Sequence, residues 1–511
     1  MPVAASAATN WLPPAALAAE ARGGGPPAVD GDDGGRAVVA WATSQHVMVA
    51  LRTPGGPWYQ PVVVPGSGRG ATEVTVAMGD RGLAAVSWIE RGRMKVSVRP
   101  ARKRFLSATT VSPAGTVAVS PRITLGGPCV PLATWAGESR TGTGPAVQVA
   151  CARASGRWSS VHTVSAPNER AFTPDVSAAP SGQAVIAWRQ DDGDQHRVRA
   201  SVRNPDGTFT APEDLSAAGP SVLVDPSVAM TASGDAVVAW TSARGADSTA
   251  QAAWRPATGD WGRAADLSRP GGVVRGARVA VDSTGSAVAT WARSGVVQAA
   301  LRPVGQDWTP PRDLSSAAVT AGSPQLDVSG AGAAIVAWPA VSGTDYVAQA
   351  ALRPAGGDFG VPTTITDPHH PAIAPQGAIA DDGVAPVAWQ STDPAVDPTI
   401  APSGVTTATG LAGSTAATPV LVDLRARPAR VSPGRRIRIT FGLSQPVRVR
   451  LSARRARSRT ESGAITVSGA DGANLIALEG GLGGTSLGRG RWVLTATPRG
   501  GTARSLTLVV R

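Results

Sequence analysis

The chain has 511 residues, of which 60 are glycine, 43 are proline and two are cysteine, and its formal net charge is +12. Two cysteines exclude a disulfide scaffold and a four-cysteine zinc site, and no apolar run approaches the roughly 18 residues of a membrane-spanning helix. All but Lys95 and Lys103 of the 48 basic residues are arginines, which fits either arginine-biased coding or a basic surface.

Residues 1–9 are small and uncharged and lack the basic and apolar parts of an intact signal peptide. They do resemble the end of such a peptide. We therefore expect either the remnant of an export segment, with the true start lying upstream, or a disordered N-terminus. The first of these implies a protein that is secreted or displayed at the cell surface.

One seven-residue segment recurs along the chain, with a glycine turn, small and β-branched residues and a closing tryptophan. The copy at 332–338 reads Gly-Ala-Ala-Ile-Val-Ala-Trp. Such a segment is typical of a short strand whose two faces are both covered. Successive copies of the tryptophan lie 47 to 53 residues apart, at Trp41, Trp88, Trp135, Trp188, Trp240, Trp291, Trp338 and Trp389.

Each repeat contains four strand-like segments. In the seventh repeat these are 323–329, 332–338, 347–353 and 359–366, and glycine-containing turns separate them. A period of 47 to 53 residues that holds only strands predicts an all-β chain in which residues 10–405 form a β-propeller.

The ends of the repeat array predict how the ring closes. Residues 10–17 match the fourth strand of a repeat at 308–314, whereas the last repeat has a third strand near 399–405 and no fourth strand. An N-terminal strand that completes the last blade would leave no large exposed edge. We expect eight blades, or seven if the first or the last repeat is not a blade.

Two side chains recur in nearly every repeat. The tryptophans are expected to fill the space between neighbouring blades, although a ring of equivalent sugar pockets would also use aromatic groups. An arginine near the end of the third strand could stack on an aromatic ring or donate to a carbonyl. It occurs in seven repeats, as Arg52, Arg99, Arg153, Arg203, Arg255, Arg302 and Arg353.

The two cysteines, Cys129 and Cys151, align with the second and third strands of one blade. These strands are adjacent and antiparallel, so a disulfide between them is geometrically feasible. Such a bond would indicate an oxidising compartment. Two small buried thiols are the alternative.

The turn before the fourth strand carries a family resemblance. At 302–308 it reads Arg-Pro-Val-Gly-Gln-Asp-Trp, which resembles the Asp-box turn of sialidase-like propellers in position and closing aromatic, but lacks the Ser-x-Asp-x-Gly order. That family's arginine triad and tyrosine nucleophile cannot be carried over, because Tyr59 lies in an outer strand and Tyr346 just before a third strand. As a whole, residues 10–405 resemble secreted, tryptophan-punctuated propellers common in actinobacteria.

Metal-ligating patterns are few. The oxygens of 191–196, Asp-Asp-Gly-Asp-Gln-His, could hold calcium, although a solvated hairpin loop explains the segment more simply. No other cofactor is expected, and no catalytic residue is assigned. Loops of this kind and those that join blades emerge on one face of a propeller. The candidate ligand residues on that face are Asp191, Asp194, His196, His369 and His370.

Past residue 405 the repeat ends. The small residues of 406–418 predict a linker, and the strands expected in 419–511 indicate an immunoglobulin-like or fibronectin-like β-sandwich. This last segment holds 17 arginines against four acidic residues, so it could attract polyanions, although arginine-rich coding is an alternative cause. Alternation would place arginines along one sheet face. The polyanion-binding candidates are Arg436, Arg438, Arg448, Arg450, Arg454, Arg455, Arg457 and Arg459.

Two classes of function fit these features. A non-enzymatic extracellular binding or scaffold protein would use the propeller for glycan or protein partners and the basic domain for attachment to anionic wall polymers, lipid headgroups or acidic polysaccharides. A glycan-active hydrolase or lyase is the alternative, and few titratable groups converge by repeat position to support it. Nucleic acid is disfavoured because Trp492 is the only aromatic residue after Phe441. We expect a monomer.

Overall fold

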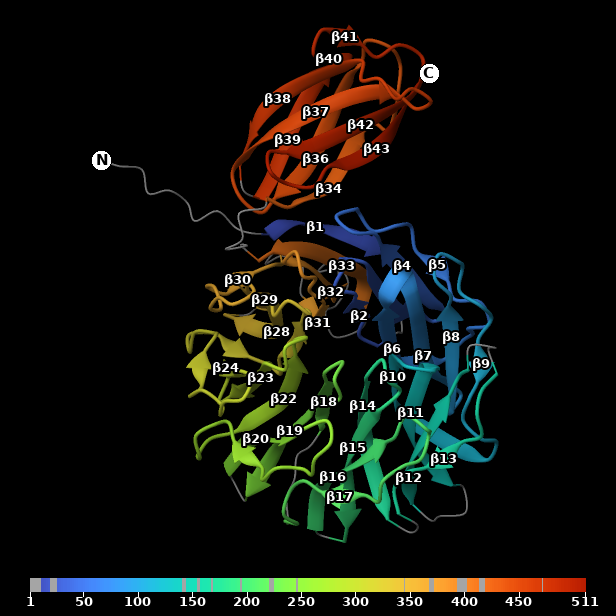
Figure 1. The fold of residues 1–511 in the computed structure, drawn as a ribbon, viewed down its shortest axis with the longest axis vertical. Coiled ribbons are helices and arrows are strands. Elements are labelled where there is room, and N and C mark those ends of the chain that lie inside the picture. The colour runs from blue at the N-terminus through green and yellow to red at the C-terminus, as the bar shows by residue number, and fades with distance from the viewer. Residues whose placement is uncertain are drawn as a thin grey trace, which may run out of the picture.

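The structure is a computed structural model that describes residues 11–18, 25–139, 144–153, 157–166, 169–193, 195–219, 225–244, 247–343, 345–366, 372–392, 402–412, 419–470 and 472–511. Every regular element in these residues is a strand except a short 3-10 turn, η1 (Asp80–Gly82). No helix in this part of the chain is long and apolar enough to cross a membrane. Figure 1 shows two parts, a ring of sheets formed by the repeats and a smaller domain formed by residues 419–511.

The repeats form seven sheets of four strands and one of five, and within each sheet consecutive strands pair antiparallel. This all-β arrangement is that of a β-propeller. The strands of the first four repeats are β2 (Ala28–Gly31), β3 (Ala37–Ala42), β4 (Val47–Arg52), β5 (Val62–Val63), β6 (Ala71–Gly79), β7 (Leu83–Glu90), β8 (Arg93–Arg99), β9 (Thr109–Thr110), β10 (Thr116–Gly126), β11 (Cys129–Ser139), β12 (Pro145–Cys151), β13 (His162–Thr163), β14 (Arg170–Ala178), β15 (Ala184–Asp192), β16 (Gln195–Arg203) and β17 (Glu213–Asp214). The strands of the later repeats are β18 (Ser227–Met230), β19 (Ala236–Arg244), β20 (Asp247–Arg255), β21 (Ala265–Asp266), β22 (Val274–Val281), β23 (Ala287–Arg293), β24 (Val296–Arg302), β25 (Arg312–Asp313), β26 (Thr320–Ala321), β27 (Gln325–Val328), β28 (Ala334–Ser342), β29 (Asp345–Arg353), β30 (Thr363–Thr364), β31 (Ala372–Gly377), β32 (Val384–Thr392) and β33 (Pro402–Leu411).

The last sheet of the ring is completed by the N-terminal strand. β1 (Trp11–Ala18) pairs antiparallel with β33, with Trp11 opposite Gly410, as the sequence predicted. β33 runs to Leu411, so part of the range 406–418 is strand where a linker was expected. The small and polar residues of this range suggested a linker, but paired with β1 they form a strand, and Trp11 is buried against the core.

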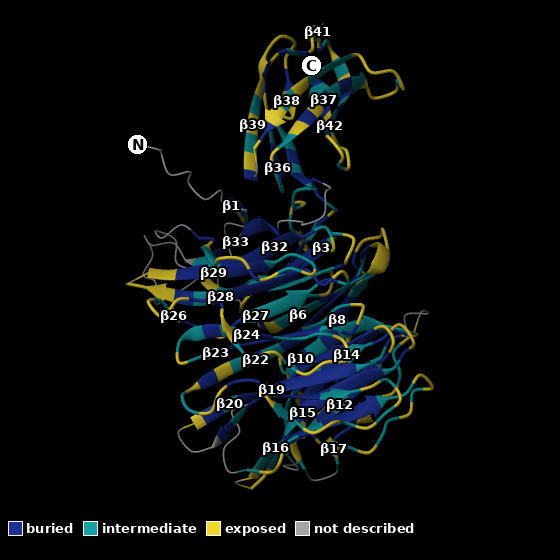
Figure 2. Ribbon diagram, turned by 60° about the vertical axis from the view of Figure 1, so that its left-hand side comes forward, coloured by how far each residue is buried: buried dark blue, intermediate teal, exposed yellow. Residues whose placement is uncertain are grey.

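The repeated tryptophans lie between neighbouring sheets. All eight have at most 2% of their surface exposed. Trp240, for example, packs in one cluster with Val198 and Ala200 of the preceding sheet. The prediction that these side chains fill the space between blades is therefore confirmed, and their burial rules them out as sugar-contacting groups. Figure 2 shows many strands of the ring in the dark blue of buried residues, with exposed residues mainly in loops and at strand ends.

Each buried indole needs a hydrogen-bond acceptor, because an unpaired buried N–H is costly. In four sheets the acceptor is the glutamine directly opposite on the third strand, as where Trp291 Nε1 donates to Gln298 Oε1 at 2.9 Å. Trp88 and Trp188 face basic residues instead, and they donate to the residue two positions later, Glu90 or Gln190. In contrast, Trp41 faces Met48, and its Nε1 has no partner in the described part of the chain.

The recurrent arginine fastens the end of the third strand to its own sheet or to the preceding one. Arg353 Nη1 donates to the carbonyl of Gly332 at 2.8 Å, and Arg203 makes the same bond to Gly182 at 2.7 Å. Arg302 instead lies 4.1 Å over the ring of Trp254 in the preceding sheet. Both expected roles, donation to a carbonyl and stacking, therefore occur.

One repeat departs from this pattern. In the sheet of β10 to β13, Ala152 takes the register position that arginine holds elsewhere, and Arg153 lies one residue later, so the expectation that Arg153 is equivalent to the other arginines is wrong. A disulfide between Cys129 and Cys151 joins the start of β11 to the end of β12. This covalent link lies close to where the arginine acts in other sheets.

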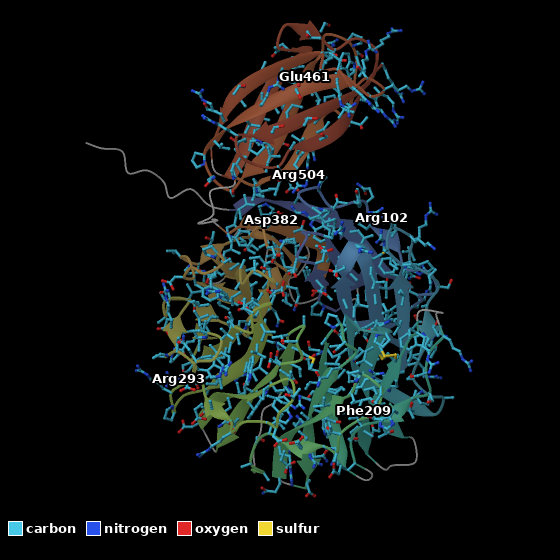
Figure 3. All side chains as sticks on the ribbon, in the orientation of Figure 1. Arg102, Phe209, Arg293, Asp382, Glu461 and Arg504 are labelled. Carbon is cyan, nitrogen blue, oxygen red and sulfur yellow. A yellow bond between two sulfur atoms is a disulfide. The ribbon has the colours of Figure 1, made fainter. Side chains whose placement is uncertain are left out.

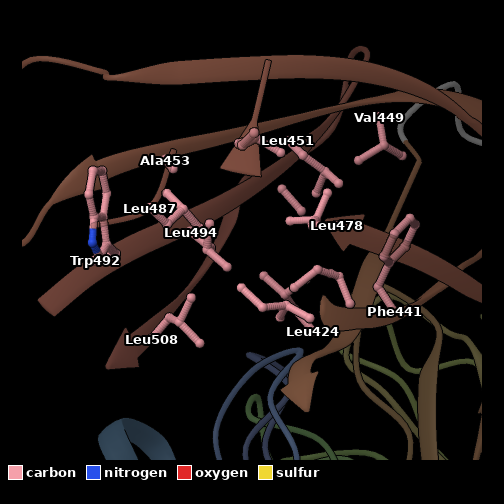
Figure 4. Packing of buried hydrophobic residues seen from close by; sticks show 14 of the residues in the cluster. Leu424, Phe441, Val449, Leu451, Ala453, Leu478, Leu487, Trp492, Leu494 and Leu508 are labelled. Atoms are coloured by element: carbon pink, nitrogen blue, oxygen red, sulfur yellow. The ribbon is translucent and has the colours of Figure 1, made fainter. Parts of the chain in front are cut away.

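The C-terminal domain consists of two sheets packed around one core. One sheet contains β34 (Leu421–Arg427), β36 (Arg436–Leu443) and β39 (Gly472–Glu479). The other contains β35 (Arg430–Val431), β37 (Val447–Arg455), β38 (Gly463–Gly469), β42 (Gly490–Pro498) and β43 (Arg504–Val510), and a small hairpin is made by β40 (Gly481–Leu482) and β41 (Thr485–Ser486). Figure 4 shows the core between them, with Phe441, Leu451 and Trp492 among its side chains.

The two parts of the molecule share a packed interface. Leu12, Val384 and Leu411 of the ring form a buried cluster with Val422 of β34. Arg52, whose side chain is 1% exposed, lies 3.5 Å from Asp423 of the C-terminal domain, and the N–H of Asp423 donates to Gly55. Figure 3 shows Arg504 at the end of the domain that faces the ring, above Asp382. The apolar cluster and the ion pair hold the domain to the propeller on the side where the ring closes.

The tryptophan–glutamine pair yields a stability test. Gln298→Leu leaves the Nε1 of Trp291 buried without its acceptor, and we expect it to lower the free energy of unfolding by about 1–3 kcal/mol. Met48→Gln supplies an acceptor to Trp41, and we expect a gain of about 0.5–1.5 kcal/mol. Urea unfolding measures both changes, with Gln306→Leu in an exposed turn as the control. Equal midpoints for all four proteins would contradict the assigned role of the pair.

Candidate functional site

The first strands of the repeats line a central cavity of about 600 Å³. Every sheet of the ring contributes at least one lining residue. The walls are polar and hold both acidic and basic side chains, among them Glu73, Arg122, Asp175, Asp225 and Arg278. A cavity of this size with a few convergent charged groups fits a ligand of small-molecule or oligosaccharide dimensions.

A repeated distortion of the backbone gives the cavity its shape. Five of the first strands, β6, β10, β14, β22 and β31, contain a break in register. At each break one residue has a positive φ, between 46° and 61°. This conformation is strained for residues other than glycine, and four of the five are not glycine. The five residues with a positive φ at these breaks are Glu73, Ser120, Thr173, Gly276 and Ala374.

The distortion positions the side chain two residues later at the cavity wall. A bulge re-aims side chains and increases strand twist. The residues that follow the strained positions in this way are Thr75, Arg122, Asp175, Arg278 and Gln376, all of which line the cavity. The backbone therefore repeats while the side chain presented to the cavity differs from sheet to sheet.

Three of these side chains form a charged cluster. Arg122 Nε lies 3.6 Å from Asp175 Oδ1, and Asp175 Oδ2 accepts the N–H of Val228 at 2.9 Å. Burial raises the pKa of Asp175, and the charges of Arg122 and Arg278 oppose that rise. Burial also lowers the pKa of Arg278. Two guanidinium groups share one carboxylate here, so the cluster carries excess positive charge when all three groups are ionised.

A second cavity of about 460 Å³ adjoins the first and shares Asp225 and Arg278 with it. Its walls add Arg189, Arg275 and Thr241. The guanidinium of Arg189 lies 4.7 Å from the centre of the Phe172 ring and pairs with Asp191, with 3.0 Å between Arg189 Nε and Asp191 Oδ1. The two cavities together form a groove lined by four arginines.

The structure joins two of the predicted ligand residues at the edge of this groove. Asp191 Oδ1 lies 2.6 Å from His196 Nδ1, and the same carboxylate pairs with Arg189. Asp191 is therefore engaged by protein groups. The other predicted ligand residues, Asp194, His369 and His370, lie outside the described residues. Within those residues no group of three or more histidine, cysteine, aspartate or glutamate side chains could hold a metal ion, and calcium stays a prediction.

The arginines of the C-terminal domain are distributed differently from the expected pattern. Arg436 and Arg438 lie on β36 and Arg448 and Arg450 on β37, and these strands belong to different sheets, so the four residues do not share one sheet face. The alternation itself is confirmed, because these arginines are exposed while the residues between them are buried. Arg450 forms two hydrogen bonds of 2.6 Å with Glu461.

The remaining predicted arginines gather at the end of the domain far from the ring. The chain after β37 runs beside the start of β42, where Ala456 N–H donates to the carbonyl of Arg491 at 3.0 Å. Arg455 lies 4.7 Å over the ring of Trp492 and donates to the carbonyl of Arg489. We call this set the arginine tip, and it comprises Arg454, Arg455, Arg457, Arg459, Arg489 and Arg491.

Two further acids lie on the first strands and bind the next sheet. Asp30 Oδ2 accepts the N–H of Met78 at 2.7 Å, and Asp327 Oδ2 accepts the N–H of Ile379 at 2.8 Å. Burial, and then the charge of Asp327, raises the pKa of Asp30 to about 7. Burial raises the pKa of Asp327 to about 6. Both carboxyls thus remain protonated in the folded chain at pH values where the unfolded chain has lost these protons.

Sequence reasoning missed the charged cluster of Arg122, Asp175 and Arg278. One signal was available, because these residues occupy equivalent places in the first strands of different repeats. The tryptophan position is constant across repeats, whereas this position changes from arginine to aspartate to glutamine. A position that varies in charge within an otherwise regular repeat indicates a surface that the fold does not constrain.

No family model matches the sequence, and no curated protein matches it. The structure is similar to solved β-propeller proteins. Polysaccharide lyase Uly1 is 10% identical, with 75% of this chain and 89% of that chain covered and a TM-score of 0.42. An ulvan lyase of family PL25 is 11% identical, with 77% and 95% covered and a TM-score of 0.43. The fucose-recognising, six-bladed Aleuria aurantia lectin is 12% identical, with 68% and 97% covered and a TM-score of 0.35. These similarities concern the fold alone.

The raised pKa values of Asp30 and Asp327 yield a pH test. Between about pH 4 and pH 7 the folded chain keeps a proton on Asp30 that the unfolded chain has lost, so the free energy of unfolding falls as the pH rises. The slope for one such group is about 1.4 kcal/mol per pH unit. We expect Asp30→Asn to remove this part of the slope in chemical unfolding measured from pH 4 to 7. Asp358→Asn, at an exposed turn, is the control, and parallel profiles for wild type and Asp30→Asn would contradict the assignment.

Proposed function

We propose that this chain is an exported, eight-bladed β-propeller with an immunoglobulin-like C-terminal domain, and that it binds acidic polysaccharides without changing them chemically. The observation that carries the proposal is the groove of two joined cavities, which is lined by Arg122, Arg189, Arg275 and Arg278. Guanidinium groups suit carboxylate-bearing or sulfate-bearing sugars because their planar fork can donate two parallel hydrogen bonds.

The architecture supports the finer parts of this proposal. Seven four-stranded sheets and one five-stranded sheet all contribute to one central cavity, as eight blades of a closed ring would. The sheets of three and five strands around a single core support an immunoglobulin-like domain. The bond between Cys129 and Cys151 supports export, because disulfides persist in oxidising compartments.

Binding is favoured over catalysis by what two of the three acidic side chains that line the groove contact. Glu73 Oε2 accepts the N–H of Ser120 at 2.7 Å, and Asp175 accepts the N–H of Val228. Both carboxylates therefore join one sheet to the next. The observation that favours a glycan hydrolase or lyase is the raised pKa of Asp175, since a general acid has to keep its proton near neutral pH.

The arginine tip supports a second contact with an anionic polymer. Its six arginines have no acidic residue within 454–460 or 488–492, and Arg455 is held in place by stacking on Trp492. Such a field attracts polyanions and weakens as salt screens it. The tip lies at the end of the domain far from the ring, so a long polymer could contact the tip and the groove at separate points.

Short oligogalacturonates test the groove directly, because they carry a carboxylate on every residue and are too short to span to the tip. We expect Arg122→Gln and Arg278→Gln each to weaken binding about tenfold or more in isothermal titration calorimetry, since each removes a charge-assisted donor. Arg312→Gln, at an exposed position on β25, is the matched control and should bind as wild type does.

Two results would overturn this proposal. Unchanged affinity in both groove variants would place the ligand elsewhere. Release of reducing ends or unsaturated products from polygalacturonate by wild type, lost in Asp175→Asn, would show a hydrolase or lyase instead of a binding protein.

A further inference from the structure

A third cavity, of about 540 Å³, lies between two neighbouring sheets and away from the groove. One wall comes from β12 and the loop that follows it, with Val149, Cys151 and Ser160. The other wall comes from the turn between β16 and β17 in the next sheet, with Asp206 and Phe209. Figure 3 labels Phe209, near the disulfide drawn in yellow.

The side chain at this interface differs from its counterpart in another sheet. In the sheet of β18 to β21 the residue three places after the cross-strand glutamine is Trp254, and its ring is covered by Arg302 of the next sheet. The equivalent residue in the sheet of β10 to β13 is Cys151, which bonds to Cys129. A disulfide takes up far less space than an indole covered by a guanidinium. Arg203 of the next sheet lines the cavity together with Cys151.

An aromatic wall closes one side of this space. The rings of His162 and Phe209 are stacked, with 4.5 Å between their centroids and 11° between their planes. The two residues come from neighbouring sheets, and both line the cavity. His162 is exposed and Phe209 half-buried, so the pair is accessible from solvent. Aromatic faces of this kind pack against the C–H face of a sugar ring.

Side chains of both charges line the cavity together with the aromatic pair. Asp206 Oδ1 accepts hydrogen bonds from the N–H and the hydroxyl of Thr208, at 2.9 and 2.7 Å. These bonds lower the pKa of Asp206, so its carboxylate stays ionised and can accept further hydrogen bonds. Arg153 is exposed and supplies donors, whereas Arg203 already donates to Gly182. One accepting and one donating group beside an apolar face match the hydroxyl edge and C–H face of a sugar.

We propose that this cavity is a second carbohydrate site, which binds a single neutral pyranose residue. The sugar ring would pack against the face of one ring of the stacked His162–Phe209 pair that the other ring leaves uncovered, and its hydroxyls would pair with Asp206 and Arg153. The site is separate from the groove, because the two sets of lining residues do not overlap. An acidic polysaccharide that also carries neutral sugars could then be held at both sites.

The test uses the methyl glycosides of glucose, galactose, mannose and N-acetylglucosamine, added singly to the full chain and followed by saturation-transfer NMR. We expect saturable binding of at least one glycoside. His162→Ala and Asp206→Asn should each weaken it about tenfold, because each removes a contact to the sugar while its own side chain is exposed and outside the core. His46→Ala, an exposed histidine on another sheet, is the control and should leave binding unchanged.

Absence of saturable binding for all four glycosides would overturn the proposal, as would binding that survives both substitutions in variants that unfold at the wild-type temperature. Oligogalacturonate affinity, measured on the same variants, should remain at the wild-type value. That comparison separates failure of this site from failure of the groove, since each site has its own substitutions and its own probe.

Discussion

The structure depends on burying an indole at each junction between sheets and giving its N–H an acceptor. A tryptophan fills the space between two twisted sheets with one side chain, but leaving its N–H unpaired in an apolar interface is costly, and among the described residues Trp41 bears that cost. Four sheets meet this constraint with a glutamine on the adjacent strand, and two meet it with Glu90 or Gln190 on the same strand. In these six repeats the second and third strands are therefore constrained at the tryptophan and at its acceptor. The N-terminal strand completes the ring on the same principle, with Trp11 buried against the last sheet.

The first strands also bury side chains in the clusters between sheets, such as Ala118 and Val274, but the positions that face the cavity differ from sheet to sheet. Their shared feature is a bulge with a strained residue, and that bulge turns the residue two places later to the central cavity. Strain of this kind persists where the surrounding structure fixes the backbone, and it is often found at functional sites. The same bulge in β10, β14 and β22 thus places Arg122, Asp175 and Arg278 at the cavity wall. The cavity beside Phe209 lies at the junction where Cys151, bonded to Cys129, takes the position that Trp254 holds in another sheet.

The propeller fold was predictable from the sequence because the tryptophan that fills the space between sheets recurs every 47 to 53 residues. The strand that completes the last sheet was predictable because residues 10–17 match the fourth strand of a repeat. The groove was not predictable, because nothing about Glu73, Ser120 or Thr173 forces a positive φ, and the bulge decides which side chain faces the cavity. The sequence of β39 does not indicate a strand, because Gly472–Glu479 lacks a clear apolar alternation and leaves Leu475 exposed. The arginines of β36 and β37 alternate as expected, but their assignment to different sheets is set by tertiary pairing.

We propose that an acidic polysaccharide binds in the groove on the first strands. Hydrogen–deuterium exchange of the full chain, with and without saturating polygalacturonate, tests this site because it reports amide protection in all strands in one experiment. We expect slower amide exchange in segments 118–124, 171–177 and 274–280, with a separate and salt-sensitive effect at 454–460. Protection confined to the arginine tip, with the three first-strand segments unchanged, would contradict the account.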